Sequence, residues 1–421
     1  MFISDQLITA IILIAVLGGY GANLLADFLN IGNLSPALPR SFSDVYDADR
    51  YTQSQHYLKE TTRFGVITST VDLVVLLVFW FSGAFGFMDQ FIRGLGFGPV
   101  ISGLCFIGTL AGLKFLISLP FSIYSTFIIE ARFGFNKTTP RLFVLDTIKA
   151  IILGTVLGAT LLSAILWFFN SAGNLAWLYC WIATTVILIV VQYIVPTWIM
   201  PLFNKFTPLE EGTLKEALFS YARSIDFPLS QIFVMDGSKR SAKANAFFTG
   251  FGNNRRIVLF DTLIQALDTR ELVAVLAHEM GHFKKKHIRN RLILGITQMG
   301  IIFYLLSLCI SQESLFTAFS VTTPSVYAGL VFFSLLFSPV DMLISVALQK
   351  LSRNDEYEAD RFAADTTGTP SALISALKKL SAQNLSNLTP HPFYVFLNYS
   401  HPPTLERMYA LEQMEDNDKG E

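Results

Sequence analysis

The sequence predicts an all-α protein that crosses a membrane seven times, with a smaller α+β domain at one membrane face. Hydrophobic residues make up 52% of the 421 residues and charged residues only 15%, against about 25% charged residues in soluble domains. Mean hydropathy is +0.48. Long apolar stretches alternate with polar segments, and nearly all lysines and arginines lie in every second polar segment. These features together indicate a polytopic membrane protein.

Composition also excludes several other classes of protein. The 52% hydrophobic content rules out disorder, which needs low hydrophobicity and high net charge. The net charge of −1 gives no basic surface for nucleic acid, so we expect no nucleic-acid partner. A disulfide-stabilised secreted domain is excluded because the cysteines number three and lie inside apolar stretches. The lipid bilayer is therefore the expected surroundings of most of the chain.

Seven apolar stretches are long enough to cross about 30 Å of hydrocarbon, which takes about 20 helical residues. They lie near 6–28, 65–87, 99–120, 147–169, 175–199, 292–311 and 325–349. Asp5 precedes the first stretch, which has no basic flank and no clear cleavage site. We therefore expect a retained span there rather than a cleaved signal peptide. The predicted division is 1–204 for five spans, 205–291 for the first soluble part, 292–349 for two spans and 350–421 for the second soluble part.

The distribution of lysine and arginine predicts the orientation in the membrane. The N-terminal end shares one side with segments 88–98, 170–174 and 312–324, and Arg93 is the basic residue on that side. The other side holds segments 29–64, 121–146, 200–291 and 350–421. We therefore expect the N-terminus outside and the long polar segments in the cytoplasm. The sequons at Asn136 and Asn384 should then carry no glycan.

An unpaired charge inside a membrane span is costly. We single out Asp72 in the second expected span and Lys114 in the third. One interpretation is that they line a water-filled cavity within the bundle. The other is a structural ion pair, or an Asp72 that lies near a span end. The sequence leaves both open.

Segment 205–291 has the pattern of a small α+β domain. A helix is expected near 209–224, and strands at 231–235, 245–249 and 256–260, with a Gly- and Asn-rich turn at 250–254. A second helix should begin at Asp268, whose side chain can cap it. Glu271, three residues later, would complete a capping box. Segment 350–421 is expected to be mostly helical.

The helix after Asp268 carries a His-Glu-x-x-His motif at residues 278–282. A spacing of four on a helix puts the imidazoles of His278 and His282 on one face, where both can bind one metal ion. Glu279 projects beside them and can act on a water molecule as general base. The motif alone also fits two surface histidines beside a glutamate.

A catalytic zinc site usually has a third protein ligand. Glu356 and Asp360 follow the last expected span, one helical turn apart, so they share a helix face. One of them can bind zinc while the other orients a ligand histidine, and the spacing does not say which. Glu358 points elsewhere. His287 lies off the ligand face, and we interpret it as structural or interfacial.

Several separated motifs, in the same order along the chain, resemble the type I CAAX prenyl protease family of integral-membrane zinc metalloproteases, which process prenylated proteins. They are the His-Glu-x-x-His motif at 278–282, a Glu-x-x-x-Asp motif at 356–360, a His-Pro-Pro…Arg motif from His401 to Arg407, and segments 124–137, 238–246 and 256–263. The resemblance covers nearly the whole chain. By themselves, His401, the two prolines and Arg407 are also typical of a helix start with a surface arginine.

The resemblance implies a fold and a set of roles. Seven helices would surround a large water-filled chamber, capped on the cytoplasmic side by a zincin-like metalloprotease domain. One zinc ion per chain would be bound, with a general base and an orienting carboxylate beside it. A strand at the sheet edge would pair with the substrate backbone. The implied ligands are His278, His282 and Glu356, the base is Glu279, the orienting group is Asp360, the residues that contact the substrate or the transition state are His401 and Arg407, and the edge-strand residues are Asn245 and Ala246.

We therefore predict a membrane-embedded zinc endopeptidase that hydrolyses peptide bonds near the C-terminus of membrane-associated substrates, prenylated or not. The alternatives are a general quality-control metalloprotease for membrane proteins, and a non-catalytic transporter or scaffold with a relic site. The chain is short for the resembled family and its outward loops are short. Both features favour a bacterial inner membrane over the endoplasmic reticulum, and we expect a monomer.

Overall fold

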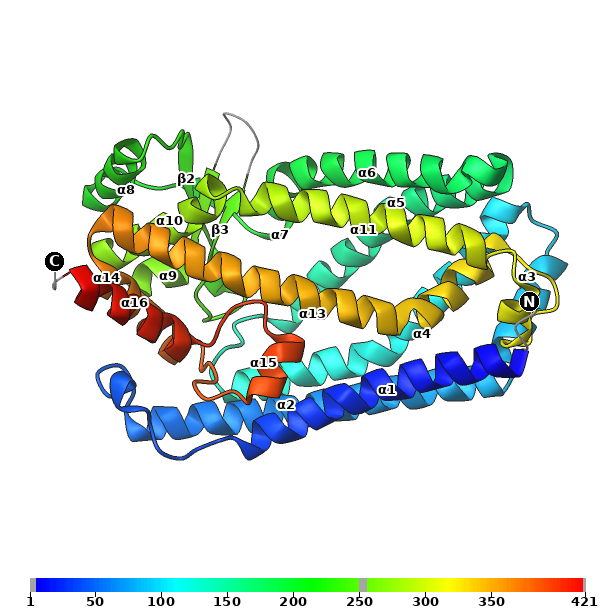
Figure 1. Ribbon diagram of the computed structural model, residues 1–421, viewed down its shortest axis with the longest axis horizontal. Helices are drawn as coiled ribbons and strands as arrows, with labels where there is room; N and C mark the ends of the chain where they lie inside the picture. Colours follow the sequence, from blue (N-terminus) through cyan, green and yellow to red (C-terminus); the bar gives the residue numbers. More distant parts are fainter. Residues whose placement is uncertain (1–4, 250–255, 419–421) are drawn as a thin grey trace.

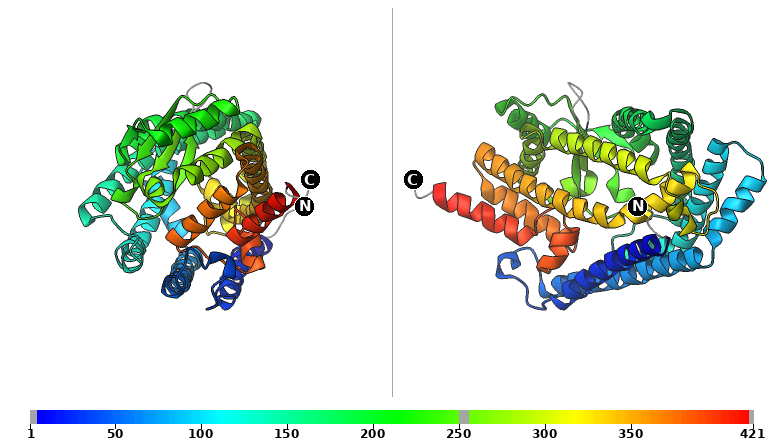
Figure 2. Two further views of the ribbon diagram at one scale, coloured as in Figure 1. Left: turned by 90° about the vertical axis from the view of Figure 1, so that its left-hand side faces the viewer. Right: turned by 45° about the vertical axis from the view of Figure 1, so that its right-hand side comes forward.

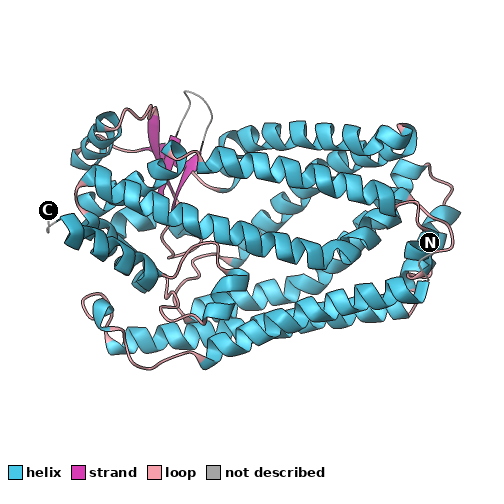
Figure 3. Cartoon of the chain, viewed as in Figure 1, coloured by secondary structure: helices cyan, strands magenta, loops and turns pink. Residues whose placement is uncertain are grey.

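The computed structural model describes residues 5–249 and 256–418, and within this part seven helices are long and apolar enough to cross a membrane. These helices run along the longest axis of the molecule, and the strands gather at one end (Figures 1 and 3). They are α1 (Asp5–Gly32), α2 (Ala48–Phe81), α4 (Pro99–Tyr124), α5 (Pro140–Ser171), α6 (Ala176–Ile194), α11 (His287–Cys309) and α13 (Val326–Thr367). The prediction of seven spans is confirmed.

Most of these helices are longer than the apolar stretches that predict them. The helix α2 begins at Ala48 because Asp47 caps it, its side chain accepting a hydrogen bond from Arg50 N at 2.6 Å. The helices α4 and α6 continue into the π-helical turns Ser125–Glu130 and Val195–Ile199, and the short α7 (Met200–Phe203) follows the second. Proline is one recognised cause of such irregularities, and Pro120 lies in the last turn before one of them.

The end remote from the sheet contains two short helices, α3 (Ala84–Gly94) and α12 (Glu313–Thr317). The second span was predicted to reach residue 87, but α2 ends at Phe81. Gly83, with φ of +74°, turns the chain there, and this left-handed conformation is easy for glycine. Buried aromatic residues from α2, α3, α12, the turn after α12 and α13 pack in the core of this end: Trp80, Phe85, Phe316, Phe319 and Phe332.

The strands form a four-stranded sheet in the described residues, in the order β1-β2-β4-β3. They are β1 (Phe206–Pro208), β2 (Gln231–Met235), β3 (Ala246–Thr249) and β4 (Arg256–Phe260). β2 and β4 are parallel, and β1 and β3 pair antiparallel to them as the two edges. The three predicted strands are present, β3 one residue shorter than predicted. β1 was not predicted, and the turn at 250–254 lies outside the described residues.

Helices pack around this sheet and complete the soluble part. They are α8 (Thr213–Ser224), α9 (Asp261–Ala266), α10 (Thr269–Lys284), α14 (Pro370–Gln383), α15 (Pro392–Asn398) and α16 (Thr404–Asp418), with short 3₁₀ turns at Arg40–Phe42, Gly173–Leu175 and Gly237–Lys239. Figure 2 shows from two other directions that these six helices lie at the same end of the bundle as the strands, whereas Gly173–Leu175 joins α5 to α6. The predicted helix at 209–224 starts later, at Thr213.

The helix α13 joins the two halves of the molecule. It spans 42 residues without interruption, from Val326 in the bundle to Thr367 in the soluble part, and its orange ribbon crosses most of the view in Figure 1. The predicted division at 349/350 therefore falls in the middle of a continuous helix. Pro339 lies inside α13 and the helix continues past it, so a single element carries residues of both the bundle and the soluble part.

Asp72 and Lys114, which were singled out in the expected spans, form an ion pair. Lys114 Nζ on α4 donates a hydrogen bond to Asp72 Oδ1 on α2, and the side chains are 57% and 46% exposed. The structural ion pair is thus present.

Candidate metal centre

The helix α10 carries the His-Glu-x-x-His motif in the core of the soluble part. Its first turn has the predicted capping box: Asp268 Oδ1 accepts from Glu271 N at 3.0 Å, and Glu271 Oε2 accepts from Asp268 N at 2.8 Å. Ser375 and Lys379 on α14 also bind the buried Glu271 carboxylate. The start of α10 is therefore fixed, and its apolar face is buried along the helix.

A glycine inside the motif lets α13 approach α10 closely. A Cβ atom at Gly281 would lie 3.2 Å from both Cα and O of Ala359, tighter than side chains normally pack. The close crossing puts residues of α13 on either side of Ala359 next to the imidazoles. Glu356 and Asp360 are therefore both buried, each 1% exposed.

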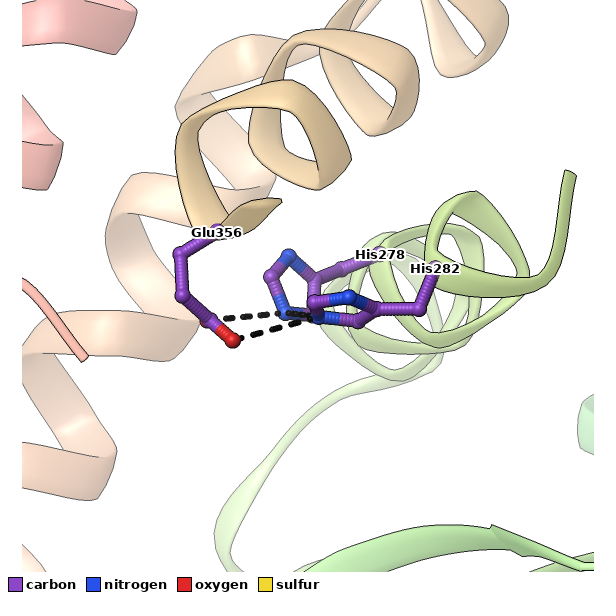
Figure 4. A group of neighbouring side chains, drawn as sticks. All are labelled: His278, His282 and Glu356. Carbon is purple, nitrogen blue, oxygen red and sulfur yellow. Dashed lines mark hydrogen bonds and ion pairs between the residues drawn. The ribbon is translucent and has the colours of Figure 1, made fainter. Parts of the chain in front are cut away.

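The two imidazoles and Glu356 converge on one point. The Nε2 atoms of His278 and His282 lie 3.2 Å apart. Glu356 Oε1 lies 3.3 Å from His282 Nε2, and Glu356 Oε2 lies 3.4 Å from His278 Nε2. Figure 4 shows the carboxylate of α13 facing both rings of α10. Among the described residues, these three form a group whose ligand atoms lie within 4.8 Å of one another.

The donor set fits a metal ion. Two imidazole nitrogens and a carboxylate oxygen are a common protein ligand set for catalytic zinc. Glu356 Oε2 is buried without a hydrogen-bond partner among the described residues, although His278 and Arg407 are its neighbours at 3.4 and 3.5 Å. A buried carboxylate oxygen in this state is unfavourable. A cation at the convergence point would supply the missing interaction.

Asp360 and Arg407 lie behind the ligand group. Asp360 Oδ1 lies 2.8 Å from His278 Nδ1, and Arg407 donates to both Asp360 oxygens at 2.6 and 2.7 Å. Burial alone lowers the pKa of His278, but the neighbouring carboxylates of Asp360 and Glu356 outweigh burial and raise it to about 9. Burial also lowers the pKa of Arg407, and the charge of Asp360 more than compensates, so the arginine stays cationic. These contacts fix the positions of His278, Asp360 and Arg407 relative to one another.

Arg407 was expected to contact the substrate or the transition state, or else to be a surface arginine. It is only 9% exposed, which excludes the surface arginine, and it is not among the residues that line the pocket over the ligands. Its bidentate contact with Asp360 explains the position, because a buried guanidinium requires a charged partner.

The other ligand histidine is backed by a residue that the sequence did not single out for this role. His287, 4% exposed, has its Nδ1 atom 3.1 Å from Nδ1 of His282. Its Nε2 atom lies 3.3 Å from Glu358 and 3.7 Å from Asp355. We interpreted His287 as structural or interfacial and Glu358 as pointing elsewhere. The missed signal is a helix break: Lys286, with φ of +64°, separates α10 from α11 and folds His287 back onto His282.

A pocket of about 270 Å³ opens above the ligand group. Its lining residues come from β3, α10, α11, α13 and the loop before α16: Phe247, Phe248, His278, Glu279, His282, His287, Ile288, Arg291, Glu356 and His401. His401 Nε2 lies 3.3 Å from Glu356 Oε1. Desolvation raises the pKa of Glu279, and the nearby imidazoles partly offset this. Burial lowers the pKa of His401.

The predicted edge-strand residues lie beside this pocket. β3 is at the sheet edge, and its residues Phe247 and Phe248 line the pocket, whereas Asn245 and Ala246 do not. Asn245 is exposed and its carbonyl accepts a hydrogen bond from Phe260 N at 3.1 Å. Its side-chain oxygen accepts from Ala246 N at 2.8 Å.

The fold and the site define a class of protein. Membrane helices that hold a His-Glu-x-x-His helix against a glutamate are the arrangement of a polytopic membrane metalloprotease. Comparison with known proteins gives the same class. Residues 27–205 match the family described as CAAX prenyl protease N-terminal, five membrane helices, and residues 208–415 match peptidase family M48.

Similar proteins include two that are named as CAAX prenyl proteases and one of known structure. The chain is 37% identical to CAAX prenyl protease 1 homolog of Oryza sativa over 90% of each chain. It is 35% identical to CAAX prenyl protease 1 of Saccharomyces cerevisiae, over 91% of this chain and 90% of that protein. The crystal structure of S. mikatae Ste24p superposes with a TM-score of 0.89 at 34% identity, over 96% of this chain and 98% of that chain.

This chain belongs to the CAAX prenyl protease group of peptidase family M48. It is a membrane metalloprotease that acts on peptides or proteins, and membership of this family implies a metal ion. The predicted family, fold class and enzyme class are confirmed, and the transporter or scaffold alternative is not favoured.

Proposed function

We propose that the metal is zinc, one ion per chain, bound by His278, His282 and Glu356. The convergence of three ligand atoms within 4.8 Å supports this assignment most directly. Glu356 rather than Asp360 is the proposed ligand, because Glu356 faces both Nε2 atoms while Asp360 faces Nδ1 of His278. Asp360 instead orients that ring, as hydrogen-bonded carboxylates commonly do for metal-binding histidines.

Peptide hydrolysis follows from the surroundings of this centre. When bound, zinc would polarise the scissile carbonyl and acidify a water molecule. Glu279 lines the pocket beside the ligands and, with its raised pKa, is suited to take a proton from water and give it to the leaving amine. His401 also lines the pocket and can donate a hydrogen bond to the oxyanion. Arg407 acts indirectly by holding Asp360.

The substrate is proposed from the names of the relatives and the edge strand. Relatives at 37% and 35% identity are named CAAX prenyl protease 1. We propose that this chain, as a monomer, cuts near the C-terminus of membrane-associated peptides, prenylated CAAX sequences included. The free edge of β3 would bind the peptide backbone as an added strand, next to Phe247 and Phe248.

The orientation and compartment are proposed separately. We propose that the metal centre faces the cytoplasm, because the sheet end carries nearly all the basic residues and α1 starts at the opposite end (Figure 1). Cysteines near Lys285 and Lys378 should label from the cytoplasm, and one near Glu313 from outside. A bacterial inner membrane gains no support, since the relatives named above are eukaryotic.

The function is tested with purified protein and matched peptides that carry or lack a farnesyl group. We expect cleavage near the C-terminus by the wild type, with zinc bound. Glu279→Ala should keep zinc and lose about 10²–10⁴ in kcat, the usual contribution of a general base. Full activity of Glu279→Ala would overturn the mechanism. Equal cleavage of both peptides would show that the enzyme does not need a prenyl group on its substrate.

A further inference from the structure

The short segment before β3 is held by an asparagine from a distant part of the chain. Ala244, buried at 6% exposure, donates its N–H to Asn384 Oδ1 at 3.1 Å, and its carbonyl accepts from Asn384 Nδ2 at 3.3 Å. One side-chain amide thus satisfies both backbone groups of Ala244. Asn384 pairs with this residue as a neighbouring strand would.

The residues on either side of Ala244 are fixed as well. The carbonyl of Lys243 accepts a hydrogen bond from Thr262 Oγ1 at 2.9 Å. The ammonium group of Lys243 lies 3.2 Å from the Glu130 carboxylate and 4.5 Å from the ring centre of Phe135. Ala242 N donates to the carbonyl of Phe135 at 3.0 Å. The segment is therefore bound both to the soluble domain and to the end of the membrane helix α4.

Asn384 is itself held in an unusual turn. It ends α14, and the next residue, Leu385, has φ of +50°, a conformation that is unfavourable for leucine. Leu385 is nevertheless buried at 5% exposure, and Ser386 N donates to Ser381 O at 2.9 Å. The surroundings thus impose this turn, which directs the Asn384 amide toward Ala244.

We propose that Asn384 is a positioning residue for substrate binding: by pairing with Ala244 it sets the place and register of the edge strand β3. This inference rests on the proposed pairing of β3 with the substrate backbone. Phe247 and Phe248, which line the pocket, are three and four residues beyond Ala244, so they are about 10–13 Å along an extended chain. A shift of the segment moves both side chains and the strand edge relative to the metal ligands.

The test compares three variants by peptide cleavage, zinc content and thermal stability. Asn384→Ala removes both hydrogen bonds, and Asn384→Asp keeps the acceptor for Ala244 N but loses the donor. Asn387→Ala is the matched control, because Asn387 binds Asn30 on α1 at 3.2 Å and does not touch the strand segment. We expect Asn384→Ala to raise KM about tenfold, as expected for two lost hydrogen bonds, with unchanged zinc content. The KM of Asn384→Asp should lie between those of the wild type and Asn384→Ala. Asn387→Ala should match the wild type in KM and zinc content.

A peptide with an N-methylated backbone separates this inference from the proposed function. The wild type should bind the methylated peptide more weakly, and Asn384→Ala should lose much of that discrimination. If the wild type does not discriminate, the edge-strand part of the proposed function fails. If it does and Asn384→Ala keeps the wild-type KM and discrimination, the positioning role is refuted. Zinc loss in parallel with activity in both Asn384 variants would likewise refute it, since the role would then be general folding.

Discussion

Each end of the helix bundle contains buried acidic side chains, but only one end leaves a carboxylate oxygen without a hydrogen bond among the described residues. At the end remote from the sheet, Asp89 is 1% exposed and both its oxygens are bound, one by Tyr327 Oη at 2.6 Å and the other by Arg93 Nε at 2.8 Å. At the sheet end, Glu356 is equally buried, but its Oε2 atom has no hydrogen-bond partner. Burial alone therefore does not identify a functional carboxylate.

The two ends differ in what completes the arrangement. Asp89, Arg93 and Tyr327 satisfy one another, so the protein alone stabilises this cluster. The imidazoles of His278 and His282 instead direct nitrogen atoms at the same point as the Glu356 oxygens. This converging arrangement is unfavourable without a cation, and it therefore marks a binding site rather than a structural contact.

The largest effect should come from removing the unpartnered carboxylate. Glu356→Ala should lower the zinc affinity by much more than Asp360→Ala, because it deletes a ligand. Loss of an orienting hydrogen bond costs about 10–100-fold in affinity or activity. The zinc affinity of both variants is measured as the zinc content that remains after dialysis against increasing concentrations of a chelator. If Asp360→Ala empties the site and Glu356→Ala leaves it filled, the ligand assignment must be exchanged.

A smaller effect is expected at the histidine behind His282. His287→Ala should weaken zinc binding about 10–100-fold, because His282 loses the ring that lies 3.1 Å from its Nδ1 atom. His287→Asn should restore part of the affinity through its side-chain oxygen. Arg289→Ala, an exposed change two residues away, is the control. Chelator competition that gives identical affinities for all variants would show that His287 only fills space.

The sequence predicted the ligand helix well because its determinants are local. The spacing of the histidines and the capping box of Asp268 and Glu271 lie within 15 residues of one another and appear in the structure as expected. The seven spans were likewise predicted, since length and hydropathy are local properties. Strand β1 was missed because three residues of alternating polarity carry little signal on their own.

The arrangement around the ligands could not be predicted in the same way, because distant contacts decide it. Arg407 can be buried because Asp360, 47 residues earlier, accepts two hydrogen bonds from its guanidinium group. His287 contacts His282 only because the chain turns at Lys286. The spacing left the choice between Glu356 and Asp360 open, and the close approach of α13 at Gly281 determines which nitrogen atoms each carboxylate faces.

The cluster around Asp89, whose carboxylate is hydrogen-bonded within the protein, allows the opposite test, in which stability changes and zinc affinity does not. Asp89→Ala should leave zinc affinity unchanged but destabilise the protein by about 1–3 kcal/mol, the usual effect of leaving buried polar groups unpaired. Tyr327 and Arg93 are those groups. Glu313→Ala, at an exposed site of the same end, is the control. A thermal melt in detergent measures the stability, and the chelator assay measures the zinc affinity. Lost zinc affinity in Asp89→Ala would contradict the independence of the two ends.

The smallest effect is expected at the ion pair between α2 and α4, which is neither buried nor part of the metal centre. Asp72 and Lys114 are 46% and 57% exposed, and we expect both to face an aqueous interior. If both face an aqueous interior, Asp72→Asn should cost less than about 1 kcal/mol, as for other solvent-exposed pairs, and the double variant Asp72→Asn/Lys114→Gln should be no worse. If both face hydrocarbon, Asp72→Asn leaves an unpaired ammonium there and costs more than Asp89→Ala, while the double variant recovers stability. Thermal melts of the single and double variants decide between these, because only a low-dielectric site makes the single change more damaging than the double one.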